Sequence, residues 1–189
     1  MRKWYLGLSL LFLSIINFAQ SVEITIKQDG NLITPVDGIY HLKKKEFAFV
    51  VHSKKIEGFL LGATFDGELY KKAIAKKLNK NVEWFQNTGM AEELYNKEKD
   101  ITVNDEAPSY WYYTDKNDHR FDKTPKGNSN DWTATRTITN IFDTSSGSPV
   151  EIKNLDQNIY ILFYEPLYNE DYDLIEKKTV FQGALQFDL

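Results

Sequence analysis

The sequence predicts a mainly β (α+β) fold: a single antiparallel β-sandwich or curled sheet, with two short helices inserted around residues 66–98. Short apolar or alternating runs recur along the chain, and Gly, Pro, Asn and Asp turn signals separate them. Aromatic residues, which suit a half-buried pleated surface, are abundant, with 11 Tyr, 12 Phe and 4 Trp. The helical patterns lie together instead of alternating with strands, which disfavours a doubly wound parallel sheet.

Residues 1–20 have the layout of a secretory signal peptide. The chain begins with the basic tripeptide Met-Arg-Lys, residues 6–16 are mostly apolar, and the small residue Ala19 lies near the end of the segment. The apolar stretch is too short for a spanning helix, which needs about 20 residues. We therefore expect cleavage of this leader and a single strand-rich domain over residues 21–189, located in the periplasm or outside the cell.

Charge and composition restrict the classes of partner. The chain has 23 basic and 27 acidic side chains, a net charge of −4, and loss of Arg2 and Lys3 with the leader lowers it to −6. Nucleic-acid binding depends on basic side chains that neutralise phosphates, so we expect no nucleic-acid partner. A basic protein would complement this charge. No apolar run after the leader is longer than a strand, so we expect no membrane span in the mature chain.

The absence of cysteine excludes thiol nucleophiles, thiolate zinc sites and CxxC redox chemistry. A chain of about 170 residues can bury about 70% of its unfolded surface, enough for a core without disulfides.

Four strands are expected before the helices. The turn signals Asp29-Gly30-Asn31 and Asp37-Gly38 both lie between the first and the second, and the polar corner Lys43-Lys44-Lys45 separates the second from the third. They cover residues 22–27, 39–42, 46–53 and 59–65. The last two have continuous apolar centres, which is typical of strands covered on both faces.

The first helix is expected to begin at Asp66, a residue type favoured at N-caps. Its apolar side would run from Leu69 to Leu78 at helical spacing. A second short helix is expected over residues 90–97.

Four more strands are expected over residues 109–114, 132–142, 159–165 and 179–188. Alternation in the second of them places Arg136 on the same face as Trp132. The polar stretch 115–131 predicts a surface loop. Pro166 is expected to end the third strand, because proline cannot donate to a ladder, and residues 167–173 to form an acidic, tyrosine-bearing loop.

Motifs for metal binding are weak. His41 and His52 lie on expected strands without an HxH or HExxH spacing, so we expect ordinary strand histidines and no cofactor. Asp115 and Asn117 alternate as in calcium loops, but His119 takes the place of the next oxygen ligand. A solvated loop is the preferred interpretation.

No nucleophile elbow of the GxSxG or SxxK type is present. Residues 145–148, Ser-Ser-Gly-Ser, lack the preceding glycine. Carboxylates in the region 104–122 could form an acid pair for glycoside hydrolysis. We expect a protein that is not an enzyme, with a small carboxylate-dependent hydrolase as the second alternative.

The sequence Tyr110-Trp111-Tyr112-Tyr113 places rings on both faces of one strand. If one face packs inside, the other can meet solvent, where Tyr and Trp are typical of interfaces. Packing of these rings in the core is the competing interpretation. The candidate binding patch consists of these and neighbouring rings with a rim of carboxylates: Tyr110, Trp111, Tyr113, Trp132, Tyr168 and Tyr172, with Asp115, Asp118 and Asp171.

The leading hypothesis is an exported, non-catalytic protein-binding domain, in its most concrete form an immunity-type inhibitor of a toxin. The alternative is a carbohydrate-binding or cell-surface adhesion module, in which the same rings would stack on a glycan.

Overall fold

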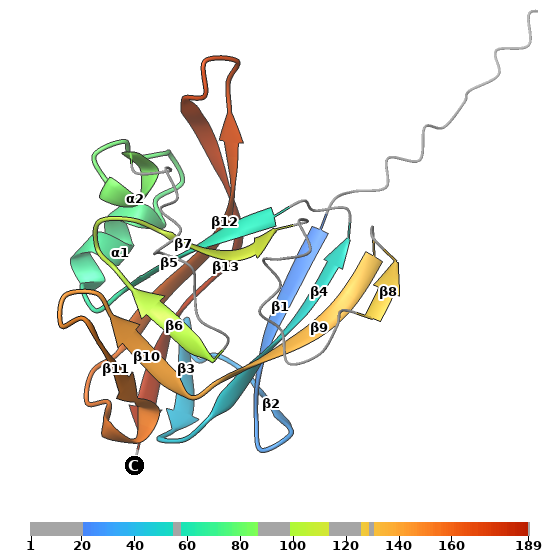
Figure 1. Cartoon of the computed structure of the whole chain (residues 1–189), viewed down its shortest axis with the longest axis vertical. Helices are drawn as coiled ribbons and strands as arrows, with labels where there is room; N and C mark the ends of the chain where they lie inside the picture. The colour runs from blue at the N-terminus through green and yellow to red at the C-terminus, as the bar shows by residue number, and fades with distance from the viewer. Residues whose placement is uncertain (1–20, 55–57, 87–98, 114–125, 129–130, 189) are drawn as a thin grey trace, which may run out of the picture.

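The computed structural model describes residues 21–54, 58–86, 99–113, 126–128 and 131–188. Within these ranges the fold consists of three β-sheets and two short α-helices (Figure 1). This confirms the expected mainly β class with two short helices. The signal peptide, the helix expected over residues 90–97, and the loop carboxylates Asp115 and Asp118 lie outside the described residues.

The first sheet has the order β2-β1-β4-β9-β8, with antiparallel neighbours throughout. Asp29 and Gly30 make the tight turn between β1 and β2 with φ of 54° and 77°, the left-handed conformation that such hairpin turns need. The strands of this sheet are β1 (Ser21–Gln28), β2 (Asn31–Ile33), β4 (Phe47–Lys54), β8 (Lys126–Asn128) and β9 (Asp131–Ile138).

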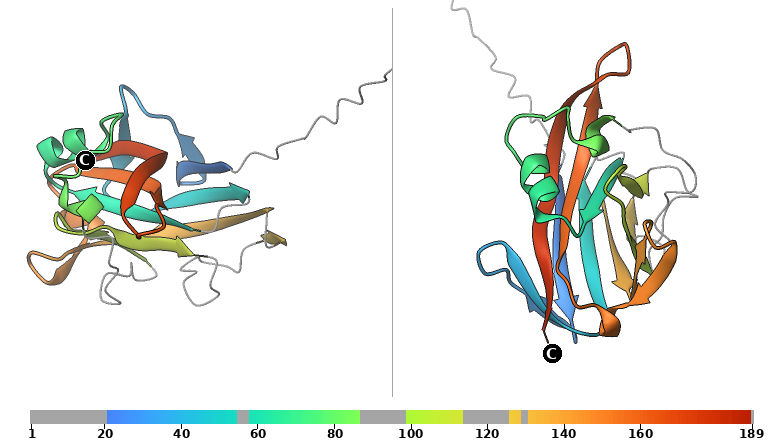
Figure 2. Two further views of the ribbon diagram at one scale, coloured as in Figure 1. Left: turned by 90° about the horizontal axis from the view of Figure 1, so that it is seen from above. Right: turned by 90° about the vertical axis from the view of Figure 1, so that its left-hand side faces the viewer.

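The second sheet has the order β3-β13-β12-β5-β7. Its members are β3 (Ile39–Lys43), β5 (Gly58–Thr64), β7 (Ser109–Tyr113), β12 (Ile159–Tyr168) and β13 (Leu174–Asp188). The edge strand β3 runs parallel to β13, while the other neighbours are antiparallel. The β12–β13 pair crosses the molecule to the C-terminal end (Figure 2), so one ladder connects several distant parts of the fold.

A third, small sheet has the order β11-β10-β6 and consists of β6 (Asp100–Val103), β10 (Asn140–Asp143) and β11 (Ser148–Glu151), followed by the 3-10 turn Ile152–Asn154. The single strand expected over residues 132–142 is therefore wrong. It divides at Thr139, whose N–H donates to the carbonyl of Lys99 at 2.9 Å. Beyond this point β10 pairs with β6 and β11 instead of continuing in the first sheet.

The main core lies between the first and second sheets and is rich in phenylalanine. Phe49 of β4 packs edge-on against Phe163 of β12 and Phe181 of β13, with ring centroids 5.5 and 6.2 Å apart. Such edge-to-face contacts stabilise aromatic pairs beyond the area that they bury. Arg136 shares a face of β9 with Trp132, as the alternation predicts, and this face is the inward one, on which Arg136 lies fully buried. Its Nη2 donates to the carbonyl of Asp100 at 3.4 Å.

A second core covers the opposite face of the second sheet. There Leu60, Leu162 and Tyr164 pack against Trp84 and Phe85 of the helical segment. Both faces of β5 and β12 are therefore buried, which accounts for their continuous apolar sequences. The same expectation is wrong for β4, where the burial pattern alternates and His52 is exposed.

Helix α1 (Gly67–Ala73) begins as expected, since the Asp66 carboxylate accepts a hydrogen bond from the N–H of Glu68 at 2.7 Å. It ends earlier than the apolar spacing predicts. Lys72, Lys76 and Lys80 would stand four residues apart in a longer helix, and like charges at that spacing are destabilising. The second described helix, α2 (Glu83–Gln86), was not expected and brings Trp84 and Phe85 into the second core.

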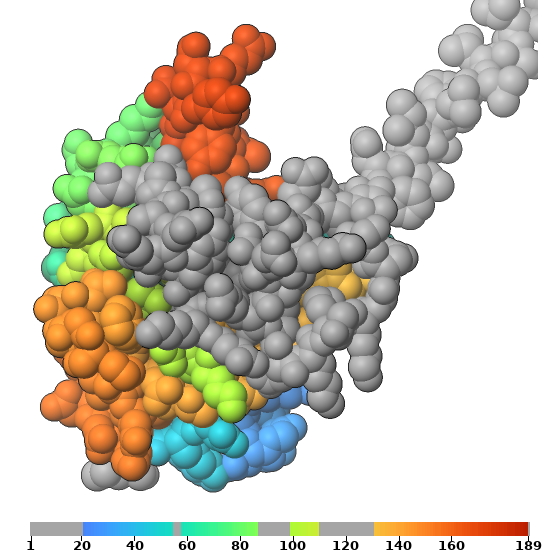
Figure 3. Space-filling model, in the orientation of Figure 1, coloured from blue at the N-terminus to red at the C-terminus, as the bar shows by residue number. Residues whose placement is uncertain are grey.

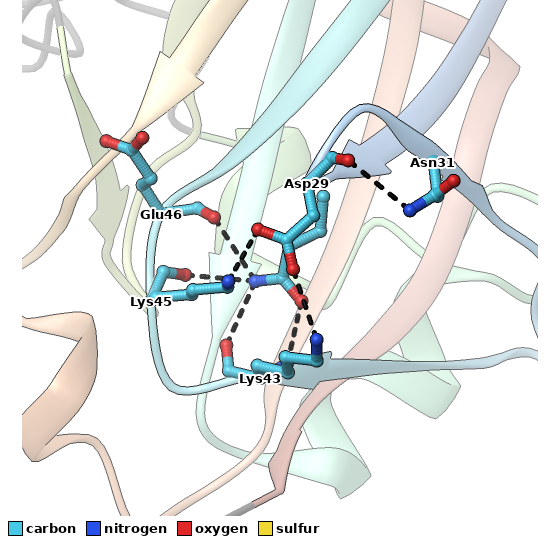
Figure 4. Close-up of polar contacts among 6 residues, drawn as sticks. Asp29, Asn31, Lys43, Lys45 and Glu46 are labelled. Atoms are coloured by element: carbon cyan, nitrogen blue, oxygen red, sulfur yellow. Dashed lines mark hydrogen bonds and ion pairs between the residues drawn. The ribbon is translucent and has the colours of Figure 1, made fainter.

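Gln28, buried at the end of β1, holds the corner at which the chain passes from β3 to β4. Its Nε2 donates to the carbonyls of Lys43, Lys45 and Glu46 at 3.0, 3.1 and 3.2 Å. Asp29 lies 2.5 Å from the Lys45 ammonium and 3.1 Å from that of Lys43 (Figure 4). These hydrogen-bonded cations hold the pKa of Asp29 below its usual 3.8. The network fixes where the first and second sheets meet.

Gly62 makes room for the Trp84 ring on the outer face of β5. A Cβ atom at this position would lie 2.4 Å from Cε3 of the indole, which is too close for any real contact. The ring is held in place from its other side, because Trp84 Nε1 donates to the carbonyl of Asn104 at 2.7 Å.

We expect Gly62→Ala to lower the free energy of unfolding by about 1–3 kcal/mol, the usual cost of overpacking a well-filled core. Denaturant unfolding measures it. In a Trp84→Leu background, which lacks the ring atoms that the new methyl would meet, the same change should cost less. An equal cost in both backgrounds would contradict the assigned contact.

Candidate functional site

The structure separates the candidate patch into three groups. Trp132 is 5% exposed and belongs to the main core, so its expected place on an exposed patch is corrected: the inward face of β9 packs on the second sheet. The strand that contains Tyr110, Trp111 and Tyr113 is β7, at an edge of the second sheet. Asp115 and Asp118 lie outside the described residues.

The remaining three candidates, Tyr168, Asp171 and Tyr172, lie together on a hairpin that we call the arm (residues 165–178). β5 pairs with β12 only as far as Tyr164, and β3 pairs with β13 only from Ala184 onward. In the arm, β12 and β13 therefore pair only with each other. The arm projects beyond the sheets (Figure 1) and stands at the top of the space-filling view (Figure 3).

Pro166 does not end the strand as expected, since β12 continues to Tyr168 and Pro166 pairs with Lys177. The reason lies in the arm itself. β5 no longer pairs with β12 beyond Tyr164, so β12 is an edge strand on that side, and an edge strand tolerates a residue without an N–H. The expected loop over residues 167–173 is consequently a strand end and a tight turn.

The outer part of the arm combines exposed apolar side chains with negative charge. Tyr172 is 87% exposed, Ile175 56%, Leu167 38% and Tyr168 36%. Residues 167–176 also contain four carboxylates, Glu170, Asp171, Asp173 and Glu176, and no basic side chain. Exposed apolar residues that lie singly are ordinary, but this many on one projecting element are typical of an interaction surface.

Asn169 organises the turn of the arm. Its Oδ1 accepts hydrogen bonds from the N–H groups of Asp171 and Asp173 at 3.1 and 2.7 Å, and its carbonyl accepts from the N–H of Tyr172 at 3.1 Å. This turn holds Tyr172 at a φ of 63°. A tyrosine in the left-handed region costs about 1–2 kcal/mol, and such strain is concentrated at functional positions.

We expect Tyr172→Gly to leave the free energy of unfolding unchanged or to raise it by up to about 1 kcal/mol, because glycine adopts positive φ without strain but gains freedom in the unfolded chain. Tyr172→Ala keeps the Cβ atom and is the matched control, for which no gain is expected. Thermal or denaturant unfolding compares them. A loss of more than about 1 kcal/mol in the glycine variant would show that the ring packs on the fold.

The arm is anchored to the second core. Leu174, which directly follows the turn, is buried in that cluster, and the ammonium of Lys177 lies 5.9 Å from the centre of the Phe85 ring, a distance at which cation–π attraction operates. Burial lowers the pKa of Lys177. These contacts hold one side of the arm, so the exposed Tyr172 is presented on a supported ribbon.

A hollow between α1 and the outer face of the second sheet is a second candidate site; we call it the tyrosine pocket. Its volume is about 490 Å³. The rings of Tyr70 from α1 and Tyr160 from β12 stack in it, 5.2 Å apart and inclined by 29°. Asp37, from the turn before β3, and Gln182 of β13 also line it. No sequence pattern predicts this pocket as a whole, although the inward positions of Ile159 and Ile161 imply that Tyr160 faces outward.

Gly67 makes the close approach of α1 to β12 practicable. A Cβ atom there would lie 3.2 Å from both Cζ and the hydroxyl oxygen of Tyr160. Asp66 and Glu68 on either side are already engaged, the first as the cap of α1 and the second with Lys71 at 2.6 Å. Among the residues that the structure describes, the phenols of Tyr70 and Tyr160 and the side chains of Asp37 and Gln182 form no hydrogen bond, and they are available to a ligand.

Burial and the nearby phenols of Tyr40 and Tyr160 raise the pKa of Tyr70 from 10.0 to about 12. The folded state thus holds this proton more tightly than the unfolded chain. The resulting stabilisation is complete below pH 10 and is lost as the pH rises towards 12.

We expect the free energy of unfolding to fall with pH above 10, and Tyr70→Phe to make this fall shallower by the contribution of one proton. Denaturant unfolding at a series of alkaline pH values gives both slopes. An unchanged slope in the variant would show that the Tyr70 phenol is solvated.

A third hollow bears on the hydrolase alternative. Asp66, Glu83, Asp105 and Glu106 line it. Asp66 caps α1, and Asp105 accepts a hydrogen bond from the Thr64 hydroxyl at 2.5 Å, so two of the four carboxylates already serve the fold. The hydrolase alternative has no further observation to favour it.

Each of the two histidines on the described strands contacts a polar side chain. His41 Nδ1 lies 2.9 Å from the Asp188 carboxylate, and His52 Nδ1 lies 2.9 Å from the Thr133 hydroxyl. They belong to different sheets. Among the residues that the structure describes, no group of three or more His, Cys, Asp or Glu side chains is arranged to hold a metal ion.

Comparisons with known proteins give no match: no family model, no curated protein and no solved structure is similar to this chain. No helix in the described ranges is long and apolar enough to cross a bilayer. The arm and the tyrosine pocket are therefore interpreted from their own geometry.

Proposed function

We propose that the chain is an exported, non-catalytic protein-binding domain that docks its partner through the arm. The observation that carries the proposal is the position of Tyr172, a strained and almost fully exposed ring at the tip of a projecting hairpin. Tyrosine is enriched among the residues that dominate binding energy, because it buries a large area at small entropic cost. The leader-like residues 1–20 support export.

The charge of the arm defines the partner. The arm has five carboxylates against two lysines, Lys177 and Lys178, and this negative balance favours a protein whose docking surface is basic at the rim and apolar at the centre. Opposite fields increase the rate of encounter and select against wrong partners. The most specific form of the proposal is an immunity-type inhibitor, in which the arm covers a basic surface of a toxin. The carbohydrate alternative loses Trp132 as a sugar platform, because that ring is buried.

Capture from the cell envelope tests the proposal. The immobilised protein and its Tyr172→Gly variant are incubated with an envelope extract, and each protein retained only by the unmodified chain is identified and purified. Its dissociation constant is then measured by calorimetry. We expect at least about tenfold weaker binding by Tyr172→Gly, as for a residue that dominates an interface, and weaker binding as salt rises from about 0.05 to about 0.5 M.

Leu32→Ala is the matched control, since Leu32 is an exposed apolar side chain on β2, away from the arm. Its affinity should equal that of the unmodified protein. If no captured protein distinguishes Tyr172→Gly from the unmodified chain, or if the affinity does not depend on salt, the proposal is wrong.

A further inference from the structure

We infer that the tyrosine pocket is a binding site for a neutral, hydroxyl-rich ring compound, that is, one sugar unit of a glycan. This inference does not depend on the function proposed for the arm. The pocket lies between α1 and the outer face of the second sheet, and its volume of about 490 Å³ is within the range of small-ligand sites. Its two rings supply an apolar wall, and its unengaged polar groups point to the class of ligand.

The hydrogen-bonding groups of the pocket match hydroxyls. The phenols of Tyr70 and Tyr160 and the amide of Gln182 can each donate and accept, while the carboxylate of Asp37 accepts. None of these four side-chain groups hydrogen-bonds to another described residue. A sugar hydroxyl also both donates and accepts, so a ring that carries several of them can satisfy the mixed set.

Charge and ring geometry distinguish this ligand from the other classes. The lining of the pocket is negatively charged, with three carboxylates and one ammonium: Asp37, Asp66 and Glu68, and Lys71. This negative charge disfavours an anionic ligand. A cationic ligand would need ring faces arranged around it, as in aromatic cages. Here the rings of Tyr70 and Tyr160 stack on each other, so each gives one face to its neighbour and they do not form opposite walls of a cage.

Two features of the backbone shape the pocket, the glycine at position 67 and the turn that contains Asp37. Gly67 has a negative φ and needs no special backbone conformation, and its missing side chain leaves the space that the Tyr160 ring occupies. Asp37 is held at a φ of 50° by the turn before β3. Asp-Gly is a usual pair for such a turn, and here the turn sets the carboxylate at the rim of the pocket.

A glycan array with the purified protein, followed by calorimetry with the best-binding oligosaccharide, tests the inference. Three variants remove one polar group each and retain the fold: Tyr160→Phe keeps the stacked ring, Asp37→Asn suits the positive φ, and Gln182→Ala changes an exposed side chain. We expect each to weaken binding about threefold to tenfold, the value of one hydrogen bond. Tyr172→Gly, on the arm, should leave the affinity for the oligosaccharide unchanged. A failure of this inference can therefore be told apart from a failure of the function proposed for the arm.

Three results would overturn the inference. The first is the absence of binding to any arrayed glycan at millimolar concentration. The second is glycan binding that none of the three pocket variants weakens, which would place the site elsewhere. The third is saturable binding of tetramethylammonium that these variants abolish, which would make the pocket a cation site. Thermal unfolding of each variant verifies that the fold is intact.

Discussion

The pairing of β12 with β13 is the interaction on which the rest of the structure depends. The pair Phe163–Phe181 places two rings in the main core, the pair Tyr160–Ala184 lines the tyrosine pocket, and Leu167 and Glu176 face each other in the arm. Side chains alternate between the two faces of a strand, so a slip of one residue would exchange the core side for the outer side along a continuous ladder. Core and pocket share one register, and the ladder shifts register after Phe163 and again after Leu167 on its way into the arm.

The second sheet is buried on both faces over its centre, and this determines where a functional surface can form. The Phe-rich core covers one face, and Trp84 with Phe85 covers the other. The β12–β13 ladder is exposed to solvent only where neither of these two cores covers it. At one such place α1 leaves the tyrosine pocket, and at another the arm passes beyond β5 and β3.

The sequence was sufficient for the fold class and for a strand with clear alternation such as β1. It was insufficient where length or a neighbour decides: β6 and β11 have four residues each, too few for a pattern, and Pro166 is tolerated because β5 no longer pairs with β12 beyond Tyr164. Of the candidate patch, Tyr168 and Tyr172 are exposed on the arm, whereas Trp132 is buried because its side chain faces inward. The tyrosine pocket unites segments that are distant in the chain, so no local pattern could indicate it.

The fit between Gly67 and Tyr160, like that between Gly62 and Trp84, has an evolutionary consequence. A methyl group at Gly62 would overlap the indole of Trp84, whereas one at Gly67 would lie 3.2 Å from Tyr160 and displace that ring by a few tenths of an ångström. A diverging lineage that acquires alanine at Gly62 must shrink or turn the opposing ring, one that acquires it at Gly67 must shift it slightly, and one that loses the ring frees the glycine to vary. We therefore expect homologues in which these positions change in pairs: a larger residue at the glycine position should accompany a smaller residue at the ring position.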